Sequence, residues 1–131
     1  MSQTKILIVE DEKDVLELIR YNLDKAGYVT ETALTGQLAL DKAIDSKPDL
    51  ILLDIMLPEI DGLDVCYNLK TNINTKSIPV IMLTAKSSEL DVMKGFEMGA
   101  DDYITKPFSP RDLLVCIQAH LSRKNIETKQ H

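Results

Sequence analysis

Short apolar runs recur along the chain, separated by segments in which apolar and polar residues mix. Most of these runs lack polar alternation, which is typical of strands covered on both faces of a sheet. Each run is followed within two residues by a charged or hydroxyl side chain that ends it. The pattern predicts five strands, at residues 6–9, 28–33, 50–53, 80–83 and 103–105.

Between the strands, apolar residues recur at the three-to-four-residue spacing of a helix. The first such segment places Val15, Leu18, Ile19 and Leu23 on one face, and Gly27 ends it. The same spacing, with its start and stop residues, predicts helices at residues 15–26, 36–46, 61–70 and 88–98 and a last helix from residue 109.

Two of these helices carry more specific expectations. In the second, Leu40 and Ile44 are expected to face the core. In the last, Ser109 can cap the helix, Pro110 suits the first helical position and Asp112 completes a capping box.

Strands and helices alternate along the whole chain, which favours an α/β fold with a doubly wound five-stranded parallel sheet and five helices. The 131 residues are the size of one domain and show no repeat or internal linker. We expect this domain to span residues 1–123, followed by a polar, frayed tail at residues 124–131.

Composition excludes several classes of function. The net charge of −6 repels phosphate backbones, and aromatic residues make up only 5% with no Trp, so direct nucleic-acid binding is not expected. Cys66 and Cys116 are far apart and are typical of free thiols in a reducing compartment. Because the sequence shows neither a signal peptide nor a membrane span, we expect a cytoplasmic protein.

Reactive polar residues follow four of the predicted strands. Glu10 and Asp11 follow the first, and Asp54, Thr84 and Lys106 follow the third, fourth and fifth. In an open parallel sheet, functional groups gather beyond the carboxyl ends of the strands. These five side chains are therefore expected to meet in one pocket.

Such a pocket has a definite chemistry. Three carboxylates that pack together raise one another's pKa unless a cation lies between them, and oxygen ligands of this kind suit Mg²⁺. An aspartate can attack phosphorus and form an acyl phosphate, while an ammonium and a hydroxyl neutralise the oxygens of the transferring group. The sequence thus predicts a phosphoryl-accepting aspartate beside a hard cation.

Four separated segments resemble the signature segments of receiver domains of two-component response regulators. They read ILIVEDE (6–12), DLILLDIMLP (49–58), LTA (83–85) and GADDYITKPF (99–108), in matching order within residues 4–123. The last segment most resembles receivers fused to winged-helix transcription factors. The resemblance implies a flavodoxin-like receiver fold with strand order 2-1-3-4-5, and a signalling switch rather than an enzyme.

The resemblance also implies a role for each pocket residue. Asp54 would accept a phosphoryl group from a sensor histidine kinase or a phosphotransfer protein, with Lys106 and Thr84 assisting. Mg²⁺ would be bound directly by Asp11, Asp54 and the backbone carbonyl of Met56. Glu10 would contribute through a water molecule.

The resemblance further implies a switch and an output surface. Thr84 would move onto the phosphoryl group, and Tyr103 would swing inward behind it. The Lys106–Pro107 peptide bond would be cis. An output domain or partner protein would bind through the fourth helix, the fifth strand and the fifth helix.

Receivers of the winged-helix class pair through this same surface, using charge pairs across a two-fold axis. The acidic partners and one arginine are present, at Glu97, Asp101, Asp102, Asp112 and Arg123. The expected basic positions instead hold Val92, Cys116 and Gln118. We expect a monomer or weak dimer, unless Val92 and Cys116 replace the charge pairs by apolar contact.

Three alternatives fit the sequence less well. A haloacid-dehalogenase-like phosphatase needs a second aspartate two residues after the nucleophile, where this chain has Met56. A flavin or nucleotide binder needs a Gly-rich or Ser-rich loop, whereas the first turn is acidic at residues 10–14. A receiver without phosphorylation would have lost Asp54, Thr84 or Lys106. Both a stand-alone receiver and a part of a longer regulator remain open.

Overall fold

The computed structural model describes residues 3–85 and 89–129 and contains five strands and five helices in strict alternation. The strands are β1 (Lys5–Val9), β2 (Val29–Ala33), β3 (Leu50–Asp54), β4 (Val80–Thr84) and β5 (Asp102–Thr105). The helices are α1 (Lys13–Lys25), α2 (Gly36–Ser46), α3 (Gly62–Thr71), α4 (Glu89–Glu97) and α5 (Pro110–Lys129). The predicted elements are confirmed, with boundaries that shift by one or two residues except at the end of α5.

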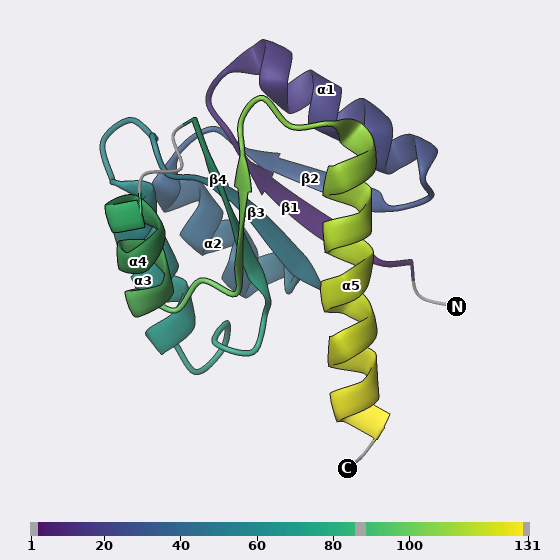
Figure 1. Cartoon of the computed structure of the whole chain (residues 1–131). Coiled ribbons are helices and arrows are strands. Elements are labelled where there is room, and N and C mark those ends of the chain that lie inside the picture. The colour runs from purple at the N-terminus through teal and green to yellow at the C-terminus, as the bar shows by residue number, and fades with distance from the viewer. Residues whose placement is uncertain (1–2, 86–88, 130–131) are drawn as a thin grey trace.

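The five strands form one parallel sheet in the order β2-β1-β3-β4-β5, which confirms the expected topology. Helices α1 and α5 cover one face of the sheet, and α2, α3 and α4 lie on the other side (Figure 1). Side chains that alternate along each strand point to opposite faces, so β1 sends Ile6 and Ile8 to the first face and Leu7 and Val9 to the second. The sheet therefore separates two apolar cores.

Helix α2 packs on the sheet through a different face from the one expected. Its buried residues are Gly36, Ala39 and Ala43, and Leu40 is partly buried against the same core. Ile44, which we expected to share that face, is 39% exposed. The small residues bring the helix close to the sheet, so burial here follows close packing rather than hydrophobicity alone.

Helix α5 begins as predicted but ends later. The Asp112 backbone N–H donates to Ser109 Oγ at 3.0 Å, which confirms the cap. The helix continues to Lys129, although we expected a frayed tail from residue 124. Residues 111–129 contain neither Gly nor Pro, so nothing in the sequence stops the helix. The domain boundary at residue 123 stays a prediction, and residues 130–131 lie outside the described part.

Among the helices of the described residues, none has both the length and the apolar character needed to cross a membrane. The longest, α5, has 20 residues and buries Leu113 and Ile117. Arg111 and Gln118 are among its exposed side chains, so its apolar surface is a stripe rather than a belt.

Candidate functional site

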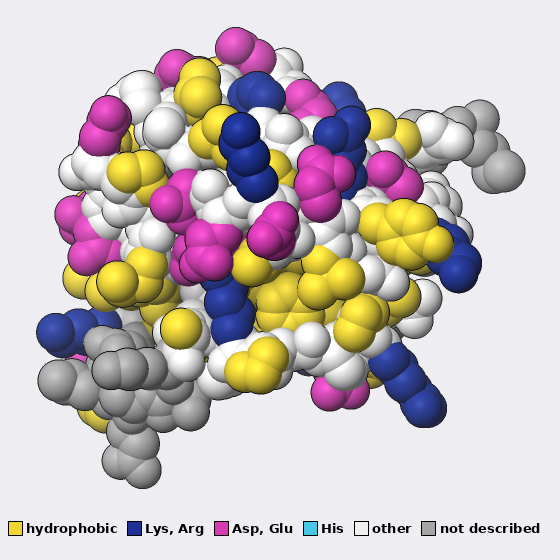
Figure 2. Space-filling view, turned by 90° about the horizontal axis from the view of Figure 1, so that it is seen from above, with side chains coloured by type: hydrophobic (Ala, Val, Ile, Leu, Met, Phe, Trp, Pro, Cys, Tyr) yellow, Lys and Arg dark blue, Asp and Glu magenta, His cyan; other side chains and the backbone are white. Residues whose placement is uncertain are grey.

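The carboxyl ends of the central strands bring the predicted pocket together. Glu10 directly follows β1, Asp54 and Thr84 are the last residues of β3 and β4, and Lys106 directly follows β5. All four lie at one edge of the sheet because the strands are parallel. Figure 2 views this end of the molecule from above and shows acidic side chains gathered beside a hydrophobic area.

Three carboxylates and one ammonium meet at this edge. Oxygen atoms of Glu10, Asp11 and Asp54 lie within 4.8 Å of one another. Lys106 Nζ is 2.6 Å from Glu10 Oε1 and 3.5 Å from Asp54 Oδ2. Glu10 and Asp54 are buried, while Asp11 is exposed, so the cluster opens to solvent on the Asp11 side.

Burial and like charge change the ionisation of the pocket. Burial and, after it, the Glu10 carboxylate together raise the pKa of Asp54 to about 7, although Lys106 acts in the opposite direction. For Lys106, burial lowers the pKa, but the hydrogen bond to Glu10 and the charge of Asp54 raise it above its ordinary value. The lysine is therefore charged at neutral pH and only partly offsets the crowded carboxylates.

Backbone contacts hold the carboxylates in place. Glu10 Oε2 accepts from the Glu12 N–H, and Asp54 Oδ1 accepts from the Met56 N–H, each at 3.2 Å. The chain after β3 then returns close to its own strand at Gly62, where a Cβ atom would lie 2.3 Å from the Asp54 carbonyl oxygen. Only glycine fits there, so Gly62 lets α3 begin directly beside the pocket.

Thr84 and Tyr103, the expected switch pair, lie on the neighbouring strands β4 and β5. Thr84 is buried at the end of β4, and its carbonyl accepts from the Lys106 N–H at 2.6 Å. Tyr103 is half-buried against α4, with its ring centroid 5.5 Å from that of Phe96. Gly95 makes this contact possible, since a Cβ atom there would lie 1.8 Å from the Tyr103 hydroxyl.

The peptide bond between Lys106 and Pro107 is cis, as the family resemblance implied. Both cysteines are free thiols, as expected.

Two acidic residues beside β5 have partners that we did not foresee. We predicted no partner within the chain for either residue, but Lys70 Nζ lies 3.0 Å from Asp101 Oδ2, and His120 Nε2 lies 2.8 Å from Asp102 Oδ2. Both partners come from other elements, α3 and α5, so no local sequence motif announces them. The only available sign for His120 was its position one helical turn after Cys116.

The donor set of the pocket fits a hard divalent cation. Three carboxylate groups provide oxygen ligands, and their crowding favours a cation between them. Burial and the charge of Glu10 raise the pKa of Asp54, and a cation at this position would offset both effects. Because these three side chains offer only oxygen atoms, the pocket is not expected to prefer a soft metal ion.

The family model for the response regulator receiver domain matches residues 6–118. The chain therefore belongs to the response regulator receiver domain family, the signalling domains of two-component systems.

Named relatives agree with this assignment. The chain is 49% identical over 122 residues to the alkaline phosphatase synthesis transcriptional regulatory protein PhoP of Bacillus subtilis. The aligned region covers 93% of this chain and 50% of PhoP. The chain thus spans about half the length of this curated relative.

Two solved structures share the fold. One is the response regulator DrrB of Thermotoga maritima, described as an OmpR/PhoB homologue, which is 38% identical to this chain and superimposes on it with a TM-score of 0.82. The match covers 94% of this chain and 54% of DrrB. The other is the receiver domain of the sensor histidine kinase PA1611 of Pseudomonas aeruginosa, which is 29% identical to this chain with a TM-score of 0.86. The match covers 92% of this chain and 99% of that receiver domain. That receiver has a magnesium ion coordinated in its active-site cleft.

Proposed function

We propose that this chain accepts a phosphoryl group on Asp54 and passes the signal to an output partner. The observation that carries the proposal is the meeting of Glu10, Asp11, Asp54 and Lys106 in one pocket at the carboxyl edge of the sheet. Incubation with acetyl phosphate and Mg²⁺, followed by intact-mass measurement, tests it. A chain that gains no mass under these conditions would contradict the proposal.

The chemical step requires little beyond positioning and charge. An Asp54 carboxylate oxygen bonds to phosphorus while the bond between phosphorus and a histidine nitrogen of the donor breaks, and that nitrogen keeps the electron pair. Lys106 lies 3.5 Å from Asp54 Oδ2, where its ammonium can neutralise a phosphoryl oxygen. The Thr84 hydroxyl would bind a further oxygen.

Mg²⁺ would be held by Asp11, Asp54 and the backbone carbonyl of Met56, with Glu10 acting through water. Both Glu10 carboxylate oxygens already accept hydrogen bonds, one from Lys106 and one from the Glu12 N–H, which supports an outer position for Glu10. When bound, the cation supplies positive charge that offsets the carboxylates and the incoming phosphoryl group.

The switch would run from Thr84 to the surface of α4, β5 and α5. Tyr103 lies on β5 between the pocket edge and α4, where its ring packs on Gly95 and Phe96. A movement of Thr84 toward the phosphoryl group frees space behind it, and an inward turn of Tyr103 would then change the surface that α4 and β5 present to an output domain or partner protein.

The donor would be a sensor histidine kinase or a phosphotransfer protein that acts in the cytoplasm. A surface pocket beside Asp54 is lined by Glu12 and Lys106 and by the apolar side chains of Val15, Leu18, Ala85, Pro107 and Phe108. A donor must come close to Asp54, and the apolar side chains of this pocket support contact with such a partner there. We do not expect direct nucleic-acid binding by this chain, because its net charge of −6 repels phosphate backbones.

The phosphorylated form is expected to be long-lived, because hydrolysis needs a water molecule in line with the Asp54–phosphorus bond. Met56 and Lys86 would flank that path, and a thioether cannot orient a water molecule. The Met56 side chain is 74% exposed beside the site, whereas Lys86 lies outside the described residues. We expect the Met56→Asn/Lys86→Glu variant to lose phosphate severalfold faster than the wild type, as measured by phosphate release.

Met93→Asn replaces another exposed methionine, on α4, and provides the matched control. It should leave the rate unchanged. A double variant that dephosphorylates at the wild-type rate would show that these two positions do not limit hydrolysis.

The activated protein is expected to be a monomer at micromolar concentration. Two of the lost charge pairs, between positions 92 and 112 and between positions 116 and 102, would each occur twice in a two-fold dimer. Partly exposed charge pairs contribute about 0.2–1 kcal/mol each, so these four absences weaken such a dimer by about 1–4 kcal/mol. The Asp102 carboxylate instead has a partner within the chain, His120. Sedimentation of the beryllofluoride-activated protein measures the oligomeric state directly.

A tight dimer that is lost on Val92→Glu would instead show that apolar contact has replaced the charge pairs. Leu38→Glu changes an exposed apolar residue of α2, far from this surface in the fold, and serves as the control. It should not alter the sedimentation of either form.

A further inference from the structure

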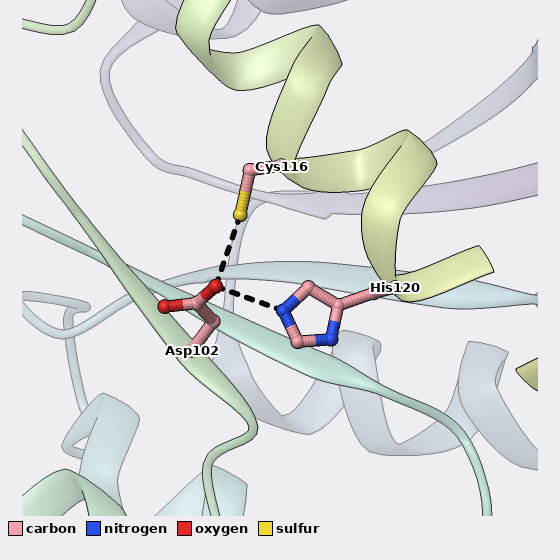
Figure 3. Close-up of side chains that lie close together, drawn as sticks. All are labelled: Asp102, Cys116 and His120. Carbon is pink, nitrogen blue, oxygen red and sulfur yellow. Dashed lines mark hydrogen bonds and ion pairs between the residues drawn. The ribbon is translucent and has the colours of Figure 1, made fainter. Parts of the chain in front are cut away.

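Three side chains with different donor atoms meet between β5 and α5. Asp102 comes from the first position of β5, and Cys116 and His120 lie one turn apart on α5, as Figure 3 shows. Asp102 Oδ2 is 2.8 Å from His120 Nε2 and accepts a hydrogen bond from Cys116 Sγ at 3.3 Å. All three donor atoms lie within 4.8 Å of one another.

The spacing of these atoms is close to that of a tetrahedral metal site. Zinc binds nitrogen and oxygen at about 2.0–2.2 Å and sulfur at about 2.3 Å, which places tetrahedral donor atoms roughly 3.3–3.6 Å apart. The distance of 3.3 Å between Asp102 Oδ2 and Cys116 Sγ already lies in this range, and the distance of 2.8 Å between Asp102 Oδ2 and His120 Nε2 would need to widen by about half an ångström. The i, i+4 placement of Cys116 and His120 puts both on one face of a continuous helix, so the frame is rigid.

We propose that Asp102, Cys116 and His120 bind a transition-metal ion of the zinc class, with an open fourth position toward solvent. The carboxylate and the thiolate together carry two negative charges, so a divalent ion with a neutral imidazole leaves the site without net charge. The Cys116 sulfur forms the bond to the metal as its proton leaves to solvent. The His120 side chain is 8% exposed and that of Asp102 is 41% exposed, so the open position lies on the Asp102 side.

The thiol is protonated when no metal is present. Burial and, after it, the hydrogen bond to Asp102 together raise the pKa of Cys116 to about 12. The cluster without metal is therefore held by hydrogen bonds to Asp102, and metal uptake replaces them with bonds to a common ion.

This site differs in chemistry from the pocket at Asp54. The pocket offers only oxygen atoms and selects a hard cation, whereas sulfur and imidazole nitrogen select a softer one. Mg²⁺ is therefore not expected at Asp102. A bound ion would tie β5 to α5, two of the three elements of the proposed output surface, and would do so whether or not Asp54 is phosphorylated.

Cobalt(II) uptake by the Asp11→Asn/Asp54→Asn background tests the proposal without interference from the acidic pocket. We expect one Co²⁺ per chain, with a thiolate-to-cobalt charge-transfer band in the near ultraviolet and the visible bands of a tetrahedral ion. Zn²⁺ should displace the Co²⁺ and abolish the charge-transfer band and the visible bands. Binding should release the thiol proton, which a weakly buffered titration records.

Variants of the three residues assign the ligands. Cys116→Ser should remove the charge-transfer band, while its hydroxyl can still donate to Asp102 and keep the fold. His120→Gln and Asp102→Asn should weaken binding by at least tenfold, since even outer partners of a metal ligand are worth about 10–100-fold. Circular dichroism of each variant verifies that α5 remains folded.

The chain offers matched controls for both donor types. Cys66→Ser changes the other cysteine, which is buried in α3, and His131→Gln changes the other histidine. Neither should alter the spectrum or the affinity. Failure of the folded protein to take up Co²⁺ or Zn²⁺, or uptake that survives both Cys116→Ser and His120→Gln, would overturn the proposal.

Discussion

Replacing Asp54 with asparagine is expected to abolish phosphorylation. Wild-type protein incubated with acetyl phosphate and Mg²⁺ should gain about 80 Da, the mass of one phosphoryl group. An asparagine amide has almost the same shape as the carboxylate but is a far weaker nucleophile toward phosphorus. We therefore expect no detectable gain in mass for Asp54→Asn, and no gain for the wild type when the divalent cation is chelated.

Asp64→Asn provides the matched control, because Asp64 is an exposed aspartate in the first turn of α3. It should be phosphorylated like the wild type. Labelling of Asp54→Asn at the wild-type level would place the acceptor elsewhere, and labelling that survives chelation would exclude the proposed role of the cation.

Mg²⁺ is expected to stabilise the fold, and most strongly above neutral pH. The pocket crowds the carboxylates of Glu10, Asp11 and Asp54, so an ion that binds only the folded state adds about 2.7 kcal/mol at a hundredfold excess over its Kd. Without Mg²⁺, the same crowding lowers the free energy of unfolding. Thermal denaturation with and without Mg²⁺ measures the difference.

The pH dependence of this effect has a defined sign. The pKa of Asp54 is about 7 in the folded protein, raised by burial and then by Glu10 from an ordinary value of 3.8. Between these two values the folded state holds a proton that the unfolded state has lost, so metal-free stability falls as pH rises through this window. At about 1.4 kcal/mol per pKa unit, roughly three units set an upper limit of about 4 kcal/mol.

Asp54→Asn removes this titration. At pH 8 without metal it should be more stable than the wild type, by up to this limit, and the advantage should shrink toward pH 5 as Asp54 of the wild type takes up a proton. Asp64→Asn should show neither effect. A wild-type melting temperature that ignores millimolar Mg²⁺ would count against a preformed cation site.

The sequence predicted most of the fold because burial on both faces leaves a local record. β1, β3 and β4 are buried along nearly their whole length, and each reads as an apolar run. The order of the strands leaves no such local record. The alternation of strands and helices limited the topology to a doubly wound sheet, and the family resemblance supplied the strand order. Helix α2 shows the limit, because its buried Ala39 and Ala43 are less hydrophobic than the exposed Ile44.

The pocket at Asp54 was predictable for a related reason. Each of its side chains stands at the end of a strand, so the parallel sheet brings Glu10, Asp54, Thr84 and Lys106 to one edge once the strands are known. The residue types at the strand ends thus predicted the chemistry of the pocket, and the family resemblance predicted the role of each residue.

Other contacts were decided only by the tertiary structure. Lys70 on α3 reaches Asp101, and His120 on α5 reaches Asp102, across separations of 31 and 18 residues. The sequence determined that these helices exist, because periodicity depends on near neighbours. How each helix is rotated on the sheet depends on the packing of both cores, and that rotation placed Cys116 and His120 over Asp102.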